Sequence, residues 1–198
     1  MTVNLAVLIS GSGTTLQNFI DKIAEGSLDA HISVVVSTRR KVFGVERAEK
    51  AGIPVEVVMR RDFEDAESFS EEVTKAIERH DVDLVILAGM LSKYLFPPRW
   101  AGRVLNIHPG LLPEYGGHGM YGHHVHEAVL AAGEAESGCT VIVADHEYDH
   151  GPTVLERRVP VLAGDTPDTL AARVFEAECE AYPEAVRMFA EGRLPALR

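Results

Sequence analysis

The sequence predicts an α/β fold with an open, mostly parallel, twisted sheet and helices on both faces. Short apolar runs rich in β-branched residues alternate with helical patterns through the first half of the chain. The first run extends from Asn4 to Ile9 and is apolar from Leu5 onward, but it is too short for a buried helix. Such a run is typical of a strand that is covered on both faces. Repeated strand–helix units imply parallel strands joined by right-handed crossovers.

The expected elements of the first half follow in order along the chain. After the first strand, Leu16, Phe19, Ile20 and Ile23 recur at the spacing of one helix face. The further elements expected are a strand over 31–37, a helix over 42–51, a strand over 55–59, a helix marked by Phe69, Val73 and Ile77, and a strand over 82–88.

The second half is less regular. A strand over 104–108 is stopped by Pro109, and a loop rich in Gly and His follows over 110–124, after which Val125 and Val129 mark a helix. Two strands are expected over 140–144 and 153–161. Thr166 can cap a last helix whose first residue is Pro167, and this helix is expected to reach about residue 191 with a kink at Pro183. Without a linker or an internal repeat, a single domain over 1–198 fits best.

Composition limits the possible partners. The chain has 198 residues and a formal net charge of −11, which argues against nucleic acid because binding a phosphate backbone requires clustered cations. No apolar run reaches the roughly 20 residues that span a bilayer. The N-terminus lacks a secretory signal. Cys139 and Cys179 form no disulfide framework and no CxxC metal site, so two reduced thiols in a cytoplasmic protein are expected.

A segment rich in Gly and Thr lies between the first strand and its helix. Its glycines, Gly11 and Gly13, allow a tight turn and a close approach of the backbone to a ligand, and Thr14 and Thr15 add hydroxyl donors. Leu16 replaces the third glycine of the dinucleotide fingerprint, and no Lys follows as a Walker A loop requires. A simple capped turn is the alternative, but the carboxyl end of a first parallel strand favours a phosphate site.

Asn106 and His108 lie two residues apart on an expected strand, so their side chains project to the same face. Pro109 ends this strand at the sheet edge where open α/β sheets bind ligands. An amide donor and an imidazole suit acyl transfer, which needs a donor for a developing oxyanion and a proton carrier near neutral pH. A histidine that is merely hydrogen-bonded at a strand end is the alternative.

Asp149 lies in a polar turn before Gly151 and Pro152. A carboxylate in such a turn commonly caps backbone amides. If it lies near His108, it could instead stabilise the charged imidazole and relay a proton through water. The sequence leaves both readings open.

The stretch containing His118, His123, His124 and His126 suggests a metal site at first sight. It has no neighbouring Cys and no H-E-x-x-H arrangement, so no metal is expected. A long irregular loop in a compact domain is more often a lid, and we expect that role for the loop over 110–124.

Together, these segments resemble the folate-dependent formyltransferases, and among them the glycinamide ribonucleotide transformylases, from Asn4 to about Leu197. The N-I-H-P segment with a downstream D-x-G-P is highly characteristic of this family. The motifs that carry the resemblance are Leu8 to Gln17, Leu87 to Met90, Leu105 to Pro109, Leu111 to Pro113, and Asp149 to Pro152.

The resemblance implies a reaction and its catalytic groups. The formyl group of 10-formyltetrahydrofolate, a co-substrate, would pass to the amine of glycinamide ribonucleotide in de novo purine biosynthesis. Asn106 would bind the formyl oxygen and contact the folate. His108 would donate a proton to the tetrahedral intermediate, and Asp149 would tune His108.

The resemblance also implies binding residues. The acceptor phosphate would be bound by Gly13, Thr14 and Thr15, and its amine would face Glu178. The residues implied to line the folate site are Leu91, Ser92, Lys93 and Tyr94. The expected state is a monomer or a homodimer.

The sequence departs from the family pattern at two positions. Ala66 stands where relatives can carry an Arg that contacts the folate, and Ile142 stands where many have His. Both changes bear on how folate or the acceptor is bound.

Several other functions compete with this one. A methionyl-tRNA formyltransferase would need a C-terminal domain and a basic surface, and a formyltetrahydrofolate hydrolase would normally add an N-terminal regulatory domain. A sugar-nucleotide N-formyltransferase would keep both signature motifs. A dinucleotide-binding oxidoreductase is disfavoured by Leu16 and by the absence of an acidic residue over 37–40. A non-catalytic ligand-binding module is the last alternative.

Overall fold

The computed structural model describes residues 2–197, and the chain divides into two compact units, 1–105 and 106–198. The helices and strands of the first unit are β1 (Val3–Ile9), α1 (Thr14–Ala24), β2 (Ala30–Ser37), α2 (Phe43–Lys50), β3 (Val55–Val57), α3 (Ala66–Glu78) and β4 (Leu84–Leu87). Arg60–Asp62 and Pro98–Trp100 form short 3-10 helices that the sequence did not predict.

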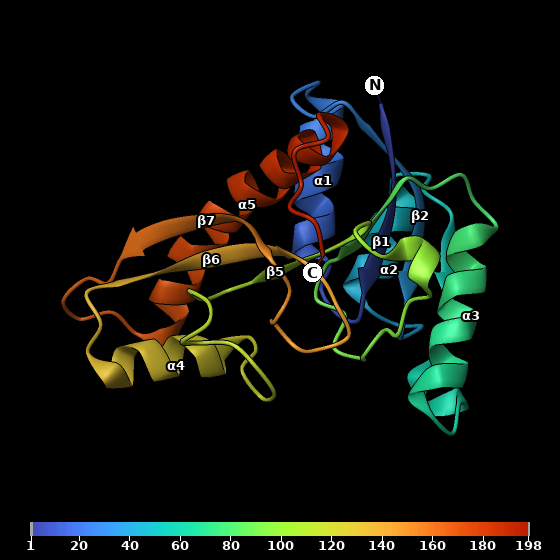
Figure 1. Ribbon diagram of the computed structural model, residues 1–198. Coiled ribbons are helices and arrows are strands. Elements are labelled where there is room, and N and C mark those ends of the chain that lie inside the picture. Colours follow the sequence, from blue (N-terminus) through green and yellow to red (C-terminus); the bar gives the residue numbers. More distant parts are fainter. Residues whose placement is uncertain (1, 198) are drawn as a thin grey trace. The chain divides into compact units, whose positions relative to one another are not determined.

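The first unit is a parallel sheet with helices on both faces. Its strand order is β3-β2-β1-β4, and β1 pairs in parallel with both β2 and β4. Along the chain, β2 and β3 are added on one side of β1, whereas β4 is added on its other side. Because each crossover is right-handed, this reversal places α3 on the face of the sheet opposite to α1 and α2. Figure 1 shows α1 and α3 on opposite sides of β1 and β2. All residues of β1 except Asn4 are buried, as expected for a covered central strand.

The second unit combines an antiparallel strand pair with two helices. Its elements are β5 (Val104–His108, which begins at the end of the first unit), α4 (His123–Ala132), β6 (Glu136–Val143), β7 (Thr153–Pro160) and α5 (Pro167–Ala190). The β6 and β7 strands pair in antiparallel fashion, and α5 packs against both.

The strand order along the chain's sheet is β3-β2-β1-β4-β5-β6-β7, which confirms the predicted open, mostly parallel α/β fold. One predicted boundary is clearly wrong, since β6 begins at Glu136 and not at residue 140. The missed residues include Gly138, a weak strand former. A Cβ at Gly138 would lie 2.1 Å from the Arg157 carbonyl oxygen in β7, so close strand packing requires a glycine there.

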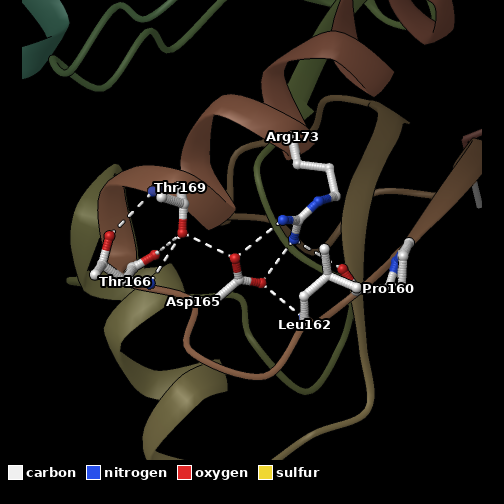
Figure 2. A network of polar contacts seen from close by, with 6 residues as sticks. All are labelled: Pro160, Leu162, Asp165, Thr166, Thr169 and Arg173. Atoms are coloured by element: carbon white, nitrogen blue, oxygen red, sulfur yellow. Dashed lines mark hydrogen bonds and ion pairs between the residues drawn. The ribbon is translucent and has the colours of Figure 1, made fainter.

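The predicted cap of the last helix is confirmed. The Thr166 hydroxyl accepts a hydrogen bond from the Thr169 amide at 3.3 Å, and the Thr169 hydroxyl accepts one from the Thr166 amide at 2.9 Å. Figure 2 shows Asp165 beside this cap, where it receives two hydrogen bonds from Arg173 at 2.7 and 2.9 Å. These bonds hold the pKa of the Asp165 carboxyl far below its usual range. The helix continues through Pro183 to Ala190.

No helix within residues 2–197 is both long enough and apolar enough to cross a membrane.

Candidate active site

The loop between β1 and α1 is shaped by Gly13. This residue precedes the first turn of α1 with φ of 69°, a left-handed conformation that favours glycine. A Cβ at Gly13 would lie 2.6 Å from the Gly44 Cα, so the loop packs directly on the start of α2. The first turn of α1 has no side-chain cap and no acidic residue, and Thr14 is exposed. Its amides can therefore face an anion, as the sequence predicted for Gly13, Thr14 and Thr15.

Arg47 of α2 braces this loop, a role that the sequence did not reveal. Its Nε donates to the Ser12 carbonyl oxygen at 3.0 Å, and its Nη1 donates to Gln17 Oε1 at 2.9 Å. Gly44 adds a backbone bond to the Gly11 carbonyl at 3.1 Å. Arg47 and Ser12 are 35 residues apart, and no local pattern links positions so distant in the sequence.

The residues predicted to line the folate site differ in exposure to solvent. Leu91 is 58% exposed, and its amide donates to Ser10 Oγ at 3.1 Å. Leu91 and Ser92 line a cavity of about 670 Å³. Tyr94 is buried, its hydroxyl is 2.9 Å from Thr74 Oγ1, and burial raises the pKa of Tyr94 to about 12. The Tyr94 side chain therefore belongs to the packing against α3, whereas Lys93 is exposed.

In the second unit, Asn106 and His108 contact the same carboxylate. The Asn106 side-chain amide donates to Asp149 Oδ1 at 3.3 Å, and His108 Nδ1 lies 3.4 Å from Asp149 Oδ2. Both residues belong to β5, and the sequence predicted that their side chains share one face of this strand. Asp149 contacts both side chains on that face. Of the two readings of Asp149, the structure supports contact with His108 and also shows a backbone-capping bond, from the Gly117 amide at 3.1 Å.

Asp149 is the only non-glycine residue with positive φ among residues 2–197, at 54°. Asp and Asn adopt this left-handed region more readily than other non-glycine residues, and such outliers cluster at functional sites. The following turn is tight, because a Cβ at Gly151 would lie 1.9 Å from the Val143 carbonyl oxygen. The turn thus fixes the direction of the Asp149 carboxylate.

His108 is buried, and both of its ring nitrogens face acceptors. Its Nε2 lies 2.6 Å from the Tyr115 carbonyl oxygen, which can only accept a hydrogen bond, so Nε2 must carry a proton. Its Nδ1 faces the Asp149 carboxylate. A neutral ring with its proton on Nε2 would direct a lone pair at that carboxylate. A ring that carries a second proton on Nδ1 can donate it toward the Asp149 carboxylate, and such a ring can act as a general acid.

Glu178 lies in α5 and is partly buried. Burial raises the pKa of its carboxyl to about 7, so it can exchange a proton near neutral pH. The buried Cys139 thiol of β6 has a pKa of about 12, raised first by burial and then by the charge of Glu178. Cys139 is therefore protonated and inert as a nucleophile at neutral pH.

The His-rich segment does not gather a metal site within residues 2–197, where no group of three or more His, Cys, Asp or Glu side chains could hold an ion. His123 lies 2.6 Å from Asp168, and His124 lies 3.5 Å from Glu127. Burial and the charges of His123 and His108 lower the pKa of the His126 ring. The lid role of the loop over 110–124 stays a prediction.

The two departures from the family pattern occupy different positions. Ala66 is the first residue of α3, after the capping residue Asp65, whereas Ile142 is buried in β6. Their effects on folate and acceptor binding stay predictions.

Known proteins resemble this chain along nearly its whole length. Residues 3–186 match the family described as formyl transferase. The phosphoribosylglycinamide formyltransferase of Escherichia coli (strain K12) is 38% identical over 194 residues, which cover 97% of this chain and 89% of that protein. The crystal structure of glycinamide ribonucleotide transformylase 1 from Symbiobacterium toebii is 36% identical with a TM-score of 0.89, covering 100% of this chain and 93% of that chain.

Larger relatives contain the same region. The trifunctional purine biosynthetic protein adenosine-3 of Drosophila pseudoobscura pseudoobscura is 41% identical over 194 residues, which are 96% of this chain. The chain spans only 14% of the length of that relative.

Proposed function

The chain belongs to the formyl transferase family, and we propose that it transfers the formyl group of 10-formyltetrahydrofolate to the amine of glycinamide ribonucleotide. The observation that carries this proposal is the contact of Asp149 with both Asn106 and His108. An amide donor, a buried imidazole and a carboxylate form the set of groups that acyl transfer requires.

The reaction forms one carbon–nitrogen bond and breaks another. The acceptor amine attacks the formyl carbon, and the folate nitrogen leaves. One proton is lost by the attacking amine, and one is gained by the leaving nitrogen. The protein therefore has to stabilise a negative oxygen and supply a proton.

Asn106 is suited to stabilise the negative charge that develops on the formyl oxygen. Its side-chain amide has two N–H donors, of which one points to Asp149 Oδ1. The second can donate to the formyl oxygen as negative charge develops there. Because Asp149 fixes the orientation of the amide, the donor is in place before the charge appears, which is the condition for effective electrostatic stabilisation.

His108 is suited to supply the proton that the leaving folate nitrogen gains. Its two ring nitrogens face the Asp149 carboxylate and the Tyr115 carbonyl, and both groups can accept a hydrogen bond from a protonated ring. Donation of a proton from such a ring aids the departure of the folate nitrogen. Through its contact with Nδ1, Asp149 holds the ring in one orientation.

The acceptor would be held by Gly13, Thr14 and Thr15 at its phosphate and by Glu178 at its amine. The uncapped start of α1 supports the first assignment, since helix N-termini favour anions. The Glu178 pKa of about 7 supports the second, because a carboxyl that titrates near neutral pH can accept a proton from an amine.

The folate would contact Leu91, Ser92, Lys93 and Tyr94 as well as Asn106. An exposed Leu91 beside a large cavity fits a flat, partly apolar ring system. The buried Tyr94 could contribute only its backbone. We assign the activity to the cytoplasm, to a monomer or homodimer, and to a reaction without metal.

An absorbance assay for loss of the formyl group from 10-formyltetrahydrofolate tests this function, run with and without glycinamide ribonucleotide. Turnover that depends on glycinamide ribonucleotide supports the proposal. Turnover only with an amino-sugar nucleotide would assign the chain to the sugar-nucleotide N-formyltransferases. Binding of NAD with no deformylation would favour the oxidoreductase, and folate binding without any turnover would favour a binding module.

A further inference from the structure

The turn that carries Asp149 connects β6 to β7. Its base is closed by the backbone, since the Val143 amide donates to the Pro152 carbonyl oxygen at 3.0 Å. Within the turn, residues 146–148 and His150 are exposed to solvent. Apolar packing therefore contributes little to the shape of this turn, which depends on polar contacts between its own residues.

Asp145 makes two such contacts across the turn. Its Oδ1 accepts a hydrogen bond from the Glu147 amide at 2.7 Å, and its Oδ2 lies 2.7 Å from His150 Nδ1. The first contact bends the chain directly after Asp145, in the pattern of an Asx-turn. The second joins the start of the exposed stretch to its end, so the pair of Asp145 and His150 closes the turn above its backbone base.

The contact between these two side chains is an ion pair. The hydrogen bond to Asp145, together with the charges of Asp145 and Glu147, raises the pKa of the His150 imidazole. Hydrogen bonds between charged groups are shorter and stronger than those between neutral ones. The His150 side chain is nevertheless 66% exposed, and such a pair adds little to the stability of a whole chain. We therefore looked for its effect within the turn.

Asp149 directly precedes His150 in this turn. Its φ of 54° lies in the left-handed region, which is unfavourable for a residue other than glycine. On the far side of His150, a Cβ at Gly151 would lie 1.9 Å from the Val143 carbonyl oxygen, so the chain has no room to shift there. The bond that His150 makes to Asp145 thus opposes relaxation of the strained residue beside it.

A small movement of Asp149 would break its contacts. Its carboxylate lies 3.4 Å from His108 Nδ1 and accepts hydrogen bonds from the Asn106 side chain at 3.3 Å and from the Gly117 amide at 3.1 Å. These distances lie in the upper part of the hydrogen-bond range, so a further displacement of about 1 Å removes the bonds. A misplacement of about 1 Å can lower the rate of an enzyme about 10²-fold.

We propose that the bond between Asp145 and His150 keeps the Asp149 carboxylate in the position that the chemistry requires. The two residues are thereby positioning residues for formyl transfer, and this inference rests on the proposed function. They act through Asp149 and not on the substrates. Loss of the pair should therefore lower kcat by a larger factor than it changes the KM of either substrate.

The kinetic test uses variants that remove different parts of the pair. Asp145→Ala removes both contacts and should lower kcat about 10²-fold, whereas His150→Ala removes one and should lower it about 10-fold. His150→Asn should restore most of the kcat, because the Asn amide can donate a hydrogen bond from about the place of the ring Nδ1. The control Arg158→Ala removes an exposed ion pair with Glu136, at 3.2 Å, from the same two strands and should keep the wild-type kcat. Unchanged kcat in Asp145→Ala and His150→Ala would overturn the proposal.

A double-variant cycle tests whether the pair acts through Asp149. In the Asp149→Asn background, His150→Ala should cause little further loss of kcat, because the carboxylate that His150 positions is already gone. A further loss of about 10-fold in that background would show that His150 acts by another route, and the proposal would be wrong.

A measurement without substrates separates this inference from the proposed function. The Gly117 amide donates to Asp149 Oδ2, so the hydrogen exchange of this amide reports on the position of the carboxylate. Exchange at Gly117, followed by NMR, should be faster in His150→Ala than in the wild type and unchanged in Arg158→Ala. If the wild type transfers no formyl group, the proposed function fails. Exchange at Gly117 then decides alone whether the pair holds Asp149: faster exchange in His150→Ala supports this, and equal exchange overturns it.

Discussion

Asp149 Oδ2 lies 3.4 Å from His108 Nδ1, while the other oxygen of the same carboxylate accepts a hydrogen bond from Asn106. One carboxylate thus orients both groups that the proposed chemistry uses. The backbone of Asp149 has a positive φ of 54°, and the Gly117 amide donates a hydrogen bond to Asp149 Oδ2. The position of this side chain is therefore fixed by its turn before any substrate binds.

Asp149→Asn should remove the charge with little change to the turn, because Asn tolerates positive φ as well as Asp does. We expect kcat to fall by about 10²-fold or more, with smaller changes in the KM of either substrate, since the charge acts on proton transfer. Steady-state kinetics measures this, with thermal unfolding as the control for folding. Unchanged kcat in Asp149→Asn would reduce Asp149 to a turn residue.

Asn106→Ala and His108→Ala should each lower kcat while the chain still folds. The expected losses are about 10²–10³-fold for an oxyanion donor and about 10²–10⁴-fold for a general acid. The double variant tests whether the two groups act as a unit, because its loss should then be smaller than the product of the single losses. Near-native kcat in either single variant would remove that residue from the chemistry.

Gly13→Ala should weaken acceptor binding and lower stability. The Ala must adopt φ near 69°, which costs about 1–2 kcal/mol, and its Cβ would also lie 2.6 Å from the Gly44 Cα. Gly26→Ala is a matched control, since Gly26 has φ of 74° with nothing within 4 Å of an added Cβ. We expect a larger loss of stability for Gly13→Ala, and a raised Kd for glycinamide ribonucleotide only there. If both changes lowered stability equally, the close packing of Gly13 on Gly44 would be contradicted. If both changed the Kd equally, the role of Gly13 in binding the phosphate would be contradicted.

Glu178→Gln should stabilise the protein at neutral and alkaline pH while it weakens acceptor turnover. The pKa of Glu178 is raised from 4.5 to about 7, so the folded state keeps a proton that the unfolded state has already lost between these values. Wild-type stability is then progressively lost as the pH rises through this window, by at most about 3 kcal/mol and less for a partly exposed group. The Gln side chain does not titrate, so Glu178→Gln does not lose stability in this pH range.

Urea unfolding at about pH 5 and about pH 8 measures this difference, which should be small at the lower pH and favour the variant at the higher. Glu176→Gln, which changes an exposed carboxyl on the same helix, should show no such pH-dependent gain. A wild type that is as stable as Glu178→Gln at the higher pH would show that the Glu178 carboxyl titrates normally.

Local patterns in the sequence determined most of the fold. The apolar run that forms β1, the helix face of Leu16 and Phe19, and the cap at Thr166 all depend on neighbours within a few residues, so they can be read from the chain alone. The start of β6 could not be read in this way. Glu136 to Cys139 lack β-branched residues, and their strand is formed by pairing with β7, which lies later in the chain.

The sequence by itself identified the residue types of the candidate site and placed Asn106 and His108 on one face of a strand. It left open whether Asp149 meets His108, because α4, β6 and their flanking loops separate the two positions and no local rule predicts how these segments return the chain to β5. Only the tertiary structure placed the Asp149 carboxylate against both residues and Arg47 against the loop at Ser12. The physical reason is the same in each case: periodicity specifies which face a side chain takes within its element, whereas contacts between distant segments depend on how loops return the chain to the same place.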